Sequence, residues 1–165
     1  MSLDDDLAKL AEQERQLQFD AFDMAKAREL GQLLQQMAGA RGLAVAIDVH
    51  LNGMQVFFCA FEGATADNAS WIRRKRNLVL RLYKSSYWAG LWLKQIGLTL
   101  YEKLTLPDAD YTPHGGCFPI MVKGTGCVGA VTVSGLPQRD DHNLVVEALV
   151  TLLGKDLASL KLADA

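Results

Sequence analysis

The dipeptide Asn52-Gly53 limits the fold of this chain more than any other short feature. It separates two strand-like runs, LAVAIDVHL and MQVFFCAF. Asn-Gly favours a two-residue turn because both residues tolerate positive φ angles, and such a turn joins antiparallel neighbours. The dipeptide therefore predicts a β-hairpin, and with it a fold in which antiparallel strands carry part of the core.

A second glycine-rich stretch, GTGCVG at residues 124–129, has the G-x-G-x-x-G spelling of a dinucleotide-binding loop. That loop works only between a strand and a helix, because the N-terminus of the helix holds the pyrophosphate. Here the strand-like run CFPIMVK precedes the glycines and AVTVSG follows them. The flanking sequence therefore predicts a second hairpin turn and argues against a nucleotide site.

Helix-forming segments surround the two hairpins. The chain begins with an N-terminal helical segment, residues 1–40, and residues 68–104 contain no proline. This middle stretch predicts one or two helices, with breaks at Gly90 and Gly97. The order helix, hairpin, helices, hairpin, helix predicts an α/β chain of the α+β type, which we interpret as one domain over residues 1–165.

The last helix is expected to begin at the sequence DDHN. Asp140 or Asp141 would cap its free N–H groups, and apolar residues at helical spacing follow. The cap explains both aspartates without a metal ion.

Composition narrows the function classes. The chain has 165 residues, half of them apolar, and a net charge of −2, which gives no general attraction to nucleic acid. Its three cysteines are scattered and lack the spacing of a zinc site. The first residues are acidic where a signal peptide is basic, and no apolar run has membrane-spanning length. We expect a cytoplasmic protein that binds no metal, nucleic acid or membrane.

The basic run WIRRKRN, residues 71–77, lies in an amphipathic helical pattern. Lys75 falls in the middle of the apolar face, beside Trp71 and Leu78. An unpaired buried ammonium is costly, so Lys75 must reach water or pair with a partner. One interpretation is a solvated helix face. The other is an anion site in which Lys75 and Arg74 or Arg76 bind a carboxylate, a phosphate or an acidic group of another subunit.

The stretch YTPHGGCFP leads into the second hairpin and carries the other candidate residues. His114 precedes Gly115 and Gly116 in a loop, where backbone can approach a ligand closely. His114 is either a surface histidine or a group that binds a ligand or transfers a proton. Ser134 lies in VSG and not in the elbow of a serine nucleophile. No catalytic constellation is visible, so enzyme activity stays open.

Two segments carry a family resemblance. HGGCFPIMVKGTGCVGAVTVSGLPQRDDH resembles the second hairpin and following helix of the GlcG/HbpS-like, or haem-degrading-domain, family. The pattern W-I-R-R-K-R-N-x-V resembles the bacterial and fungal branch of that family. The resemblance runs from Leu43 onward. It implies a profilin-like three-layer α-β-α sandwich, an antiparallel sheet built from two hairpins, and a homo-oligomer, either a dimer or a larger assembly.

Two functional hypotheses follow. In the first, which we favour because no catalytic constellation is visible, the protein is a binding or assembly module for a small anionic molecule or a partner subunit. In the second hypothesis the protein binds or degrades haem. Only the resemblance implies this cofactor, because no residue of this chain can be matched individually to a haem ligand of the family. The expected ligand-site residues are Arg74, Lys75, His114, Gly115, Gly116 and Ser134.

Overall fold

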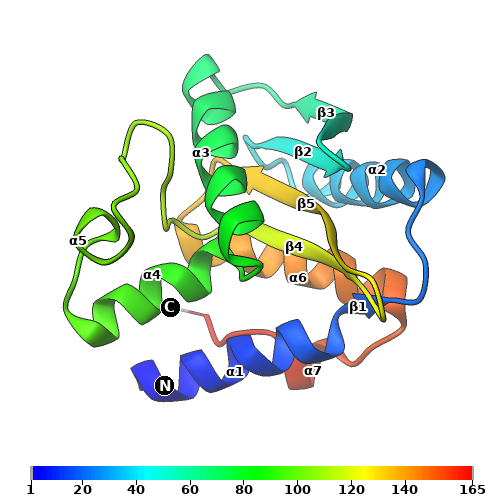
Figure 1. Cartoon of the computed structure of the whole chain (residues 1–165). Helices are drawn as coiled ribbons and strands as arrows, with labels where there is room; N and C mark the ends of the chain where they lie inside the picture. Colours follow the sequence, from blue (N-terminus) through cyan, green and yellow to red (C-terminus); the bar gives the residue numbers. More distant parts are fainter. Residues whose placement is uncertain (1, 165) are drawn as a thin grey trace.

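A five-stranded mixed sheet forms the centre of the computed structural model, which describes residues 2–164 (Figure 1). The strands are β1 (Gln18–Phe19), β2 (Ala46–Leu51), β3 (Met54–Ala60), β4 (Cys117–Val122) and β5 (Gly126–Ser134). Their order across the sheet is β1-β4-β5-β2-β3. The two hairpins meet where β5 pairs antiparallel with β2.

Both predicted hairpin turns are confirmed. Asn52 and Gly53 have φ angles of 50° and 79° between the antiparallel strands β2 and β3. Gly124 and Gly126, with φ angles of 75° and 106°, turn the chain between β4 and β5. Because the stretch GTGCVG connects two antiparallel strands, it has no helix N-terminus on which to hold a pyrophosphate.

The expectation of a purely antiparallel sheet needs one correction. The two-residue strand β1 pairs parallel with β4 at the edge of the sheet. This strand comes from the N-terminal segment to which the sequence assigned only helices. Two residues carry no periodicity, so the strand exists only because the fold brings it beside β4.

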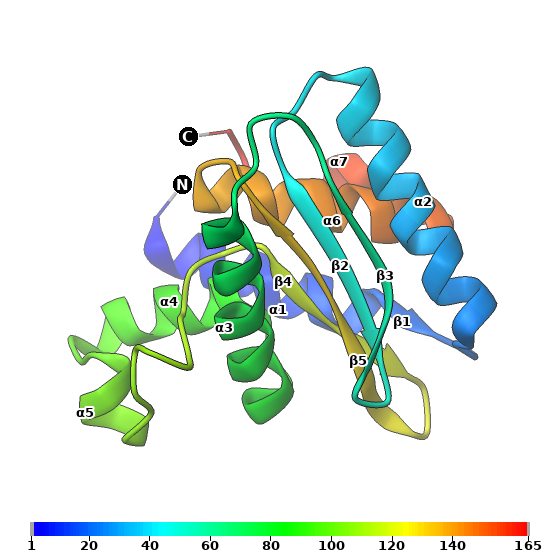
Figure 2. The same cartoon turned by 90° about the horizontal axis from the view of Figure 1, so that it is seen from above.

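Helices cover both faces of the sheet (Figure 2). They are α1 (Leu3–Gln16), α2 (Met24–Ala40), α3 (Ala66–Leu82), α4 (Ser86–Ile96), α5 (Leu100–Leu104), α6 (Gln138–Leu153) and α7 (Leu157–Leu160). Helices α2 and α6 pack on one face and α3 on the other, while α1 packs against α4 and α7. Within residues 2–164, none of these helices is both long and apolar enough to cross a membrane.

The main hydrophobic core lies between the sheet and helices α2 and α6. Phe118, Ile47 and Leu149 are among its largest fully buried side chains. On the opposite face, α3 buries Leu78 and Val79, as its apolar stripe predicts. The position of Lys75 within this buried stripe is also confirmed.

The middle helices end differently from the sequence prediction. Gly97 does end α4, with a φ angle of 68°. Gly90, however, lies inside α4, where a Cβ atom would be 2.4 Å from the carbonyl oxygen of Pro113. The predicted break at Gly90 is therefore wrong, because this glycine permits close contact with a loop. The actual break follows α3, where Tyr83 adopts a φ angle of 57° and the side chain of Ser85 caps α4.

Candidate functional site

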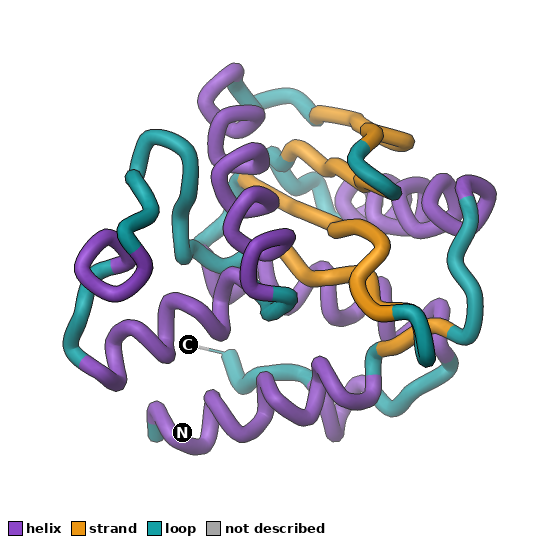
Figure 3. The backbone as a smooth tube through the Cα atoms, in the orientation of Figure 1, coloured by secondary structure: helices purple, strands orange, loops and turns teal. Residues whose placement is uncertain are grey.

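Two neighbouring pockets share a wall formed by Trp71 and His114. Their ring centroids are 4.8 Å apart and the ring planes are inclined by 52°. The smaller pocket, of about 230 Å³, lies between α3, the end of β5 and the start of α6. The larger, of about 500 Å³, lies between α3, α4 and the loop of residues 105–116, which Figure 3 traces beside α3. The larger volume suits a small molecule, whereas the smaller one lies below the usual range of about 300–1,000 Å³.

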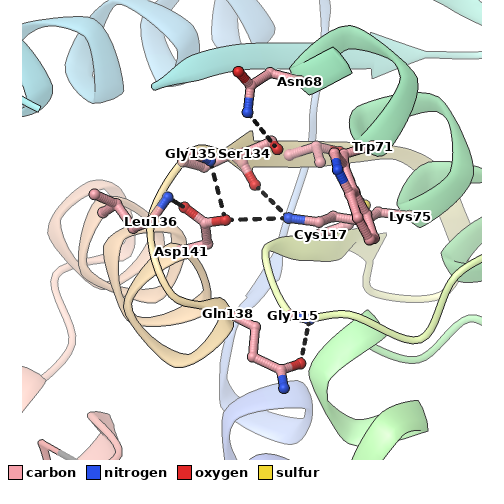
Figure 4. Close-up of polar contacts among 12 residues, drawn as sticks. Asn68, Trp71, Lys75, Gly115, Cys117, Ser134, Gly135, Leu136, Gln138 and Asp141 are labelled. Atoms are coloured by element: carbon pink, nitrogen blue, oxygen red, sulfur yellow. Dashed lines mark hydrogen bonds and ion pairs between the residues drawn. The ribbon is translucent and has the colours of Figure 1, made fainter. Parts of the chain in front are cut away.

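A buried ion pair forms the floor of the smaller pocket (Figure 4). The Nζ of Lys75 donates hydrogen bonds to Oδ2 of Asp141, at 3.2 Å, and to the carbonyl oxygen of Val133, at 3.1 Å. The Asp141 carboxylate also accepts from the N–H groups of Gly135, at 3.3 Å, and Leu136, at 2.9 Å. Lys75 thus keeps its charge by pairing with a partner. The alternative for a lysine on the apolar face was to extend its side chain to water.

Burial controls the electrostatics of this pair. It raises the pKa of Asp141 to about 6 and lowers the pKa of Lys75, because each charged form loses hydration. The opposite charge of the partner counteracts both shifts. Since the two charges offset each other, the smaller pocket presents little net charge to a ligand.

Asp141 does not have its predicted role as a helix cap. Helix α6 begins after Pro137 and has no side-chain cap. The Asp141 carboxylate instead binds N–H groups that precede the helix, together with Lys75. The sequence prediction failed because the lysine partner lies 66 residues away.

The double glycine allows the loop before β4 to approach this ion pair. Gly116 has a φ angle of 127°, and a Cβ atom there would lie 2.4 Å from the carbonyl oxygen of Val133 and 2.8 Å from Nζ of Lys75. A Cβ atom on Gly115 would lie 2.4 Å from the carbonyl oxygen of Gln138. The N–H of Gly115 donates to Oε1 of Gln138, at 3.1 Å. Both glycines therefore shape the pocket through close backbone packing.

A polar contact links the start of α3 to the end of β5. The side-chain amide of Asn68 donates to Oγ of Ser134, at 3.2 Å. Its Oδ1 accepts from the N–H of Thr65, at 2.9 Å, as part of the capping box of α3. Asn68 and Ser134 both line the smaller pocket, so their contact helps to fix its shape.

Arg74 lies on the other side of the shared wall. Its guanidinium carbon is 4.1 Å from the centroid of the Trp71 ring, which indicates a cation–π interaction. Arg74 lines the larger pocket with His114, Lys94 and one carboxylate, that of Asp108. Among residues 2–164, no side chain or carbonyl group forms a hydrogen bond or ion pair with the Arg74 guanidinium. Its N–H donors are therefore free to bind a ligand.

His114 is exposed at the rim of both pockets. Partial burial of its ring, together with the positive charges of Lys75 and Arg74, lowers the pKa of His114 from its usual value of 6.5. The imidazole is therefore largely neutral at pH 7. The neighbouring indole is fixed in position because Nε1 of Trp71 donates to the carboxylate of Asp67, at 3.1 Å.

The structure divides the predicted site residues between two compartments. Lys75 and Ser134 line only the smaller pocket, Arg74 lines only the larger one, and His114 lines both. Gly115 and Gly116 line neither pocket and act through backbone packing. Arg76, the alternative neighbour of Lys75, instead pairs with a fully buried carboxylate, that of Asp48, at 3.1 Å.

Two features of the site are not predicted from the sequence. One is the place of Trp71 in the wall, although a tryptophan three residues before an arginine on a helix is well placed for a cation–π contact. The other is Gln138, because nothing local to this residue indicates that it contacts the double glycine.

The fold and the paired pockets define a mixed α/β protein whose five-stranded sheet is flanked by helices and has a small-molecule-sized site at one end. Residues 22–150 match the model of the family described as "Haem degrading protein HbpS-like". The chain belongs to this family, as the two resembling segments of the sequence predict.

Relatives of known sequence and structure agree with this assignment. A UPF0303 protein from Rhizobium etli is 61% identical over 163 residues, which cover 99% of each chain. A UPF0303 protein from Paraburkholderia phymatum is 52% identical and covers both chains completely. The crystal structure of yeast Ybr137w has a TM-score of 0.82 at 29% identity, covering 90% of this chain and 87% of that one.

A more distant structure shares the fold alone. The crystal structure of a PduOC–haem complex has a TM-score of 0.67 at 14% identity, covering 79% of this chain and 94% of that one.

Proposed function

We propose that the protein is a binding module that holds a small anionic molecule against the Trp71–His114 wall, with Arg74 as the main anion ligand. The observation that carries this proposal is the unpaired guanidinium of Arg74, held over Trp71 and lining the larger pocket. A planar guanidinium binds carboxylate or phosphate through two parallel hydrogen bonds. The Trp71 indole beneath the guanidinium holds it in place and leaves the N–H donors of Arg74 available to a ligand.

Lys75 has a different role in this proposal. Its ammonium is bound to Asp141 and to the carbonyl oxygen of Val133, so it has little capacity left for a ligand. The ion pair instead fixes the loop that carries His114, because Gly116 packs against Nζ of Lys75. Lys75 is therefore a positioning residue, and Arg74 and His114 contact the ligand.

Haem binding is the second candidate, and it is supported by the family description and by the haem that PduOC holds in its complex. The smaller pocket and its ion pair do not fit this group. The smaller pocket holds about 230 Å³ above a polar floor, which is less than the space that drug-sized ligands need. The ring of His114 lies against Trp71, and His142 is completely buried with Nε2 bound to Gln13. The smaller pocket therefore supports no haem chemistry.

The test compares Arg74→Met with Arg81→Met by isothermal titration calorimetry. Arg81 lies on the same helix but is exposed and lines neither pocket, so it controls for the loss of one positive charge. The probes are sulfate, inorganic phosphate and succinate. We expect at least one probe to bind the wild type and the Arg81 variant equally, and Arg74→Met to weaken its binding about tenfold or more, which corresponds to about 1.4 kcal/mol.

Two results would overturn the proposal. One is equal affinity of Arg74→Met and the wild type for every probe that binds. The other is a saturable Soret shift at one haemin per chain, with no binding of the anions, which would favour the haem candidate.

A further inference from the structure

The larger pocket has an apolar side that the binding of an anion by Arg74 does not use. This side is lined by Leu93 of α4, by Leu98 in the link to α5 and by Leu100 of α5. Figure 1 shows α4 and α5 on the side of the molecule away from α2. A cavity of about 500 Å³ with an apolar side admits a ligand larger than an inorganic anion.

The protein itself covers the three leucines to different extents. Leu93 and Leu100 are buried in a hydrophobic cluster that also contains Leu78 of α3. Leu98 is 41% exposed, although it lines a concave site. A ligand with an apolar body would cover Leu98 and remove apolar surface from water, which favours binding in proportion to the area covered. The pocket therefore offers apolar surface and the Arg74 guanidinium to the same ligand.

The loop of residues 105–116 holds the polar and apolar sides of the pocket at a fixed spacing. The N–H of Thr112 donates to the carbonyl oxygen of Arg74, at 3.2 Å, which ties the loop to α3. On the other side, the loop packs directly on α4, because a Cβ atom on Gly90 would lie 2.4 Å from the carbonyl oxygen of Pro113. The arrangement is thus formed before a ligand binds.

The charges of the larger pocket suit a ligand with one negative charge. Within residues 2–164, the charged side chains that line it are Arg74, Lys94 and Asp108, while the His114 imidazole is largely neutral at pH 7. Two cations and one carboxylate leave one positive charge uncompensated. A second anionic group on the ligand would be repelled by Asp108. A monoanion therefore fits the pocket better than a dianion.

From these observations we infer that the ligand of the larger pocket is an amphipathic monocarboxylate, with its carboxylate on Arg74 and its apolar body against the three leucines. The inference rests on the proposed function, because it takes Arg74 as the anion ligand. It narrows the ligand class in two ways. An inorganic anion would fill only the polar side, and a dicarboxylate would bring a second charge to apolar side chains and Asp108.

The first test measures the affinity of the wild type for butyrate, hexanoate and octanoate by isothermal titration calorimetry. Burial of methylene groups predicts an increase in affinity of about two- to fourfold for each carbon added. Adipate is the matched control, since it has the six carbons of hexanoate and a second carboxylate. We expect adipate to bind about tenfold more weakly than hexanoate. Equal affinity for butyrate and octanoate, or for adipate and hexanoate, would overturn the inference.

The second test removes apolar surface from the pocket. It compares Leu98→Ala with Ile96→Ala, because Ile96 is 39% exposed, lies two residues earlier and does not line the pocket. We expect Leu98→Ala to weaken octanoate binding about fivefold and to leave sulfate binding unchanged, while Ile96→Ala changes neither. A Leu98→Ala variant with the wild-type affinity for octanoate would contradict the inference.

These tests separate the ligand class from the proposed function. If sulfate and the carboxylates all require Arg74 but affinity does not increase with chain length, the proposed function stands and the inference about the ligand class is wrong. If Arg74→Met binds every one of these probes as tightly as the wild type does, the proposed function fails and the inference fails with it.

Discussion

The ammonium of Lys75 lies 3.2 Å from the carboxylate of Asp141, which follows 66 residues later in the chain, and both side chains are almost completely buried. This ion pair joins α3 to α6 and supports the loop that carries His114. Removing one partner leaves an uncompensated charge in the interior. The pair therefore provides a direct test of how the site is held together.

We predict that Lys75→Met destabilises the protein by about 3–5 kcal/mol, because Asp141 then remains buried without its counter-ion. The double variant Lys75→Met/Asp141→Asn should recover part of this loss, since asparagine still offers an oxygen to the N–H groups of Gly135 and Leu136. Urea denaturation of both single variants and the double variant gives the coupling energy. Additive effects would show that the two side chains do not stabilise each other.

A substitution in the double glycine should affect stability more than one in an open turn. Gly116→Ala places a Cβ atom 2.4 Å from the carbonyl oxygen of Val133 and close to Lys75, whereas at Gly124 no atom lies within 4 Å. Gly124, with a φ angle of 75° against 127° at Gly116, shows the cost of a positive φ angle without a clash, which is about 1–2 kcal/mol in the left-handed region. Thermal unfolding should show a clearly larger loss for Gly116→Ala. Equal losses of stability would mean that the loop before β4 moves away from Val133 at no cost in free energy.

His142 should make stability depend on pH. Its Nε2 lies 2.8 Å from Oε1 of Gln13, whose amide nitrogen donates to the carbonyl oxygen of Leu160, so Nε2 carries the proton. The buried Nδ1 has no hydrogen-bond partner within residues 2–164. Complete burial, and then the charge of Arg139, lowers the pKa of His142 to about 3 from its usual 6.5. The folded state therefore resists protonation of this ring.

Between pH 6.5 and about 3 the unfolded chain binds the His142 proton more tightly than the folded chain does. Its contribution to stability is complete above pH 6.5 and declines as pH falls through this window. We predict that the free energy of unfolding decreases less steeply with acid in His142→Gln, which cannot titrate. Denaturant unfolding at several pH values measures the difference. Parallel profiles for the two proteins would contradict this role of His142.

Anion binding should be coupled to protonation of His114. In the protein without a bound anion, partial burial and two nearby cations lower the pKa of His114. A bound anion would raise this pKa again. Sulfate affinity is therefore expected to increase as pH falls through the pKa of His114 in the complex. Sulfate keeps its charge between pH 5 and 8, so protonation of the probe does not contribute to the change in affinity. Calorimetry from pH 5 to 8 should give a slope for the wild type that His114→Gln lacks.

The features that the sequence predicts well are local ones. The Asn52-Gly53 turn, the glycine turn at Gly124 and the end of α4 at Gly97 each depend on φ angles that few other residues adopt. The position of Lys75 on the apolar face of α3 follows from helical spacing alone. Each of these predictions needed only residues within one element or one turn.

The features that the sequence does not predict depend on distant contacts. The strand β1 is defined by its pairing with β4, about 100 positions later in the chain, at residues Met121 and Val122. Gly90 remains helical because α4 meets Pro113, and Asp141 binds Lys75 rather than capping its helix. For the same reason, the sequence grouped Arg74 with Lys75 although the Trp71–His114 wall separates them into two pockets.

In the proposed site, an anion binds the guanidinium of Arg74 beside His114. The most direct measurement follows the side-chain ¹⁵N signals of the arginines and histidines by NMR as sulfate is added. We expect the signals of Arg74 Nε–H and of the His114 ring nitrogens to shift together and saturate, while those of Arg81 and His142 do not respond. Saturable shifts elsewhere with an unchanged Arg74 signal, or no saturable shift of Arg74 at all, would contradict it.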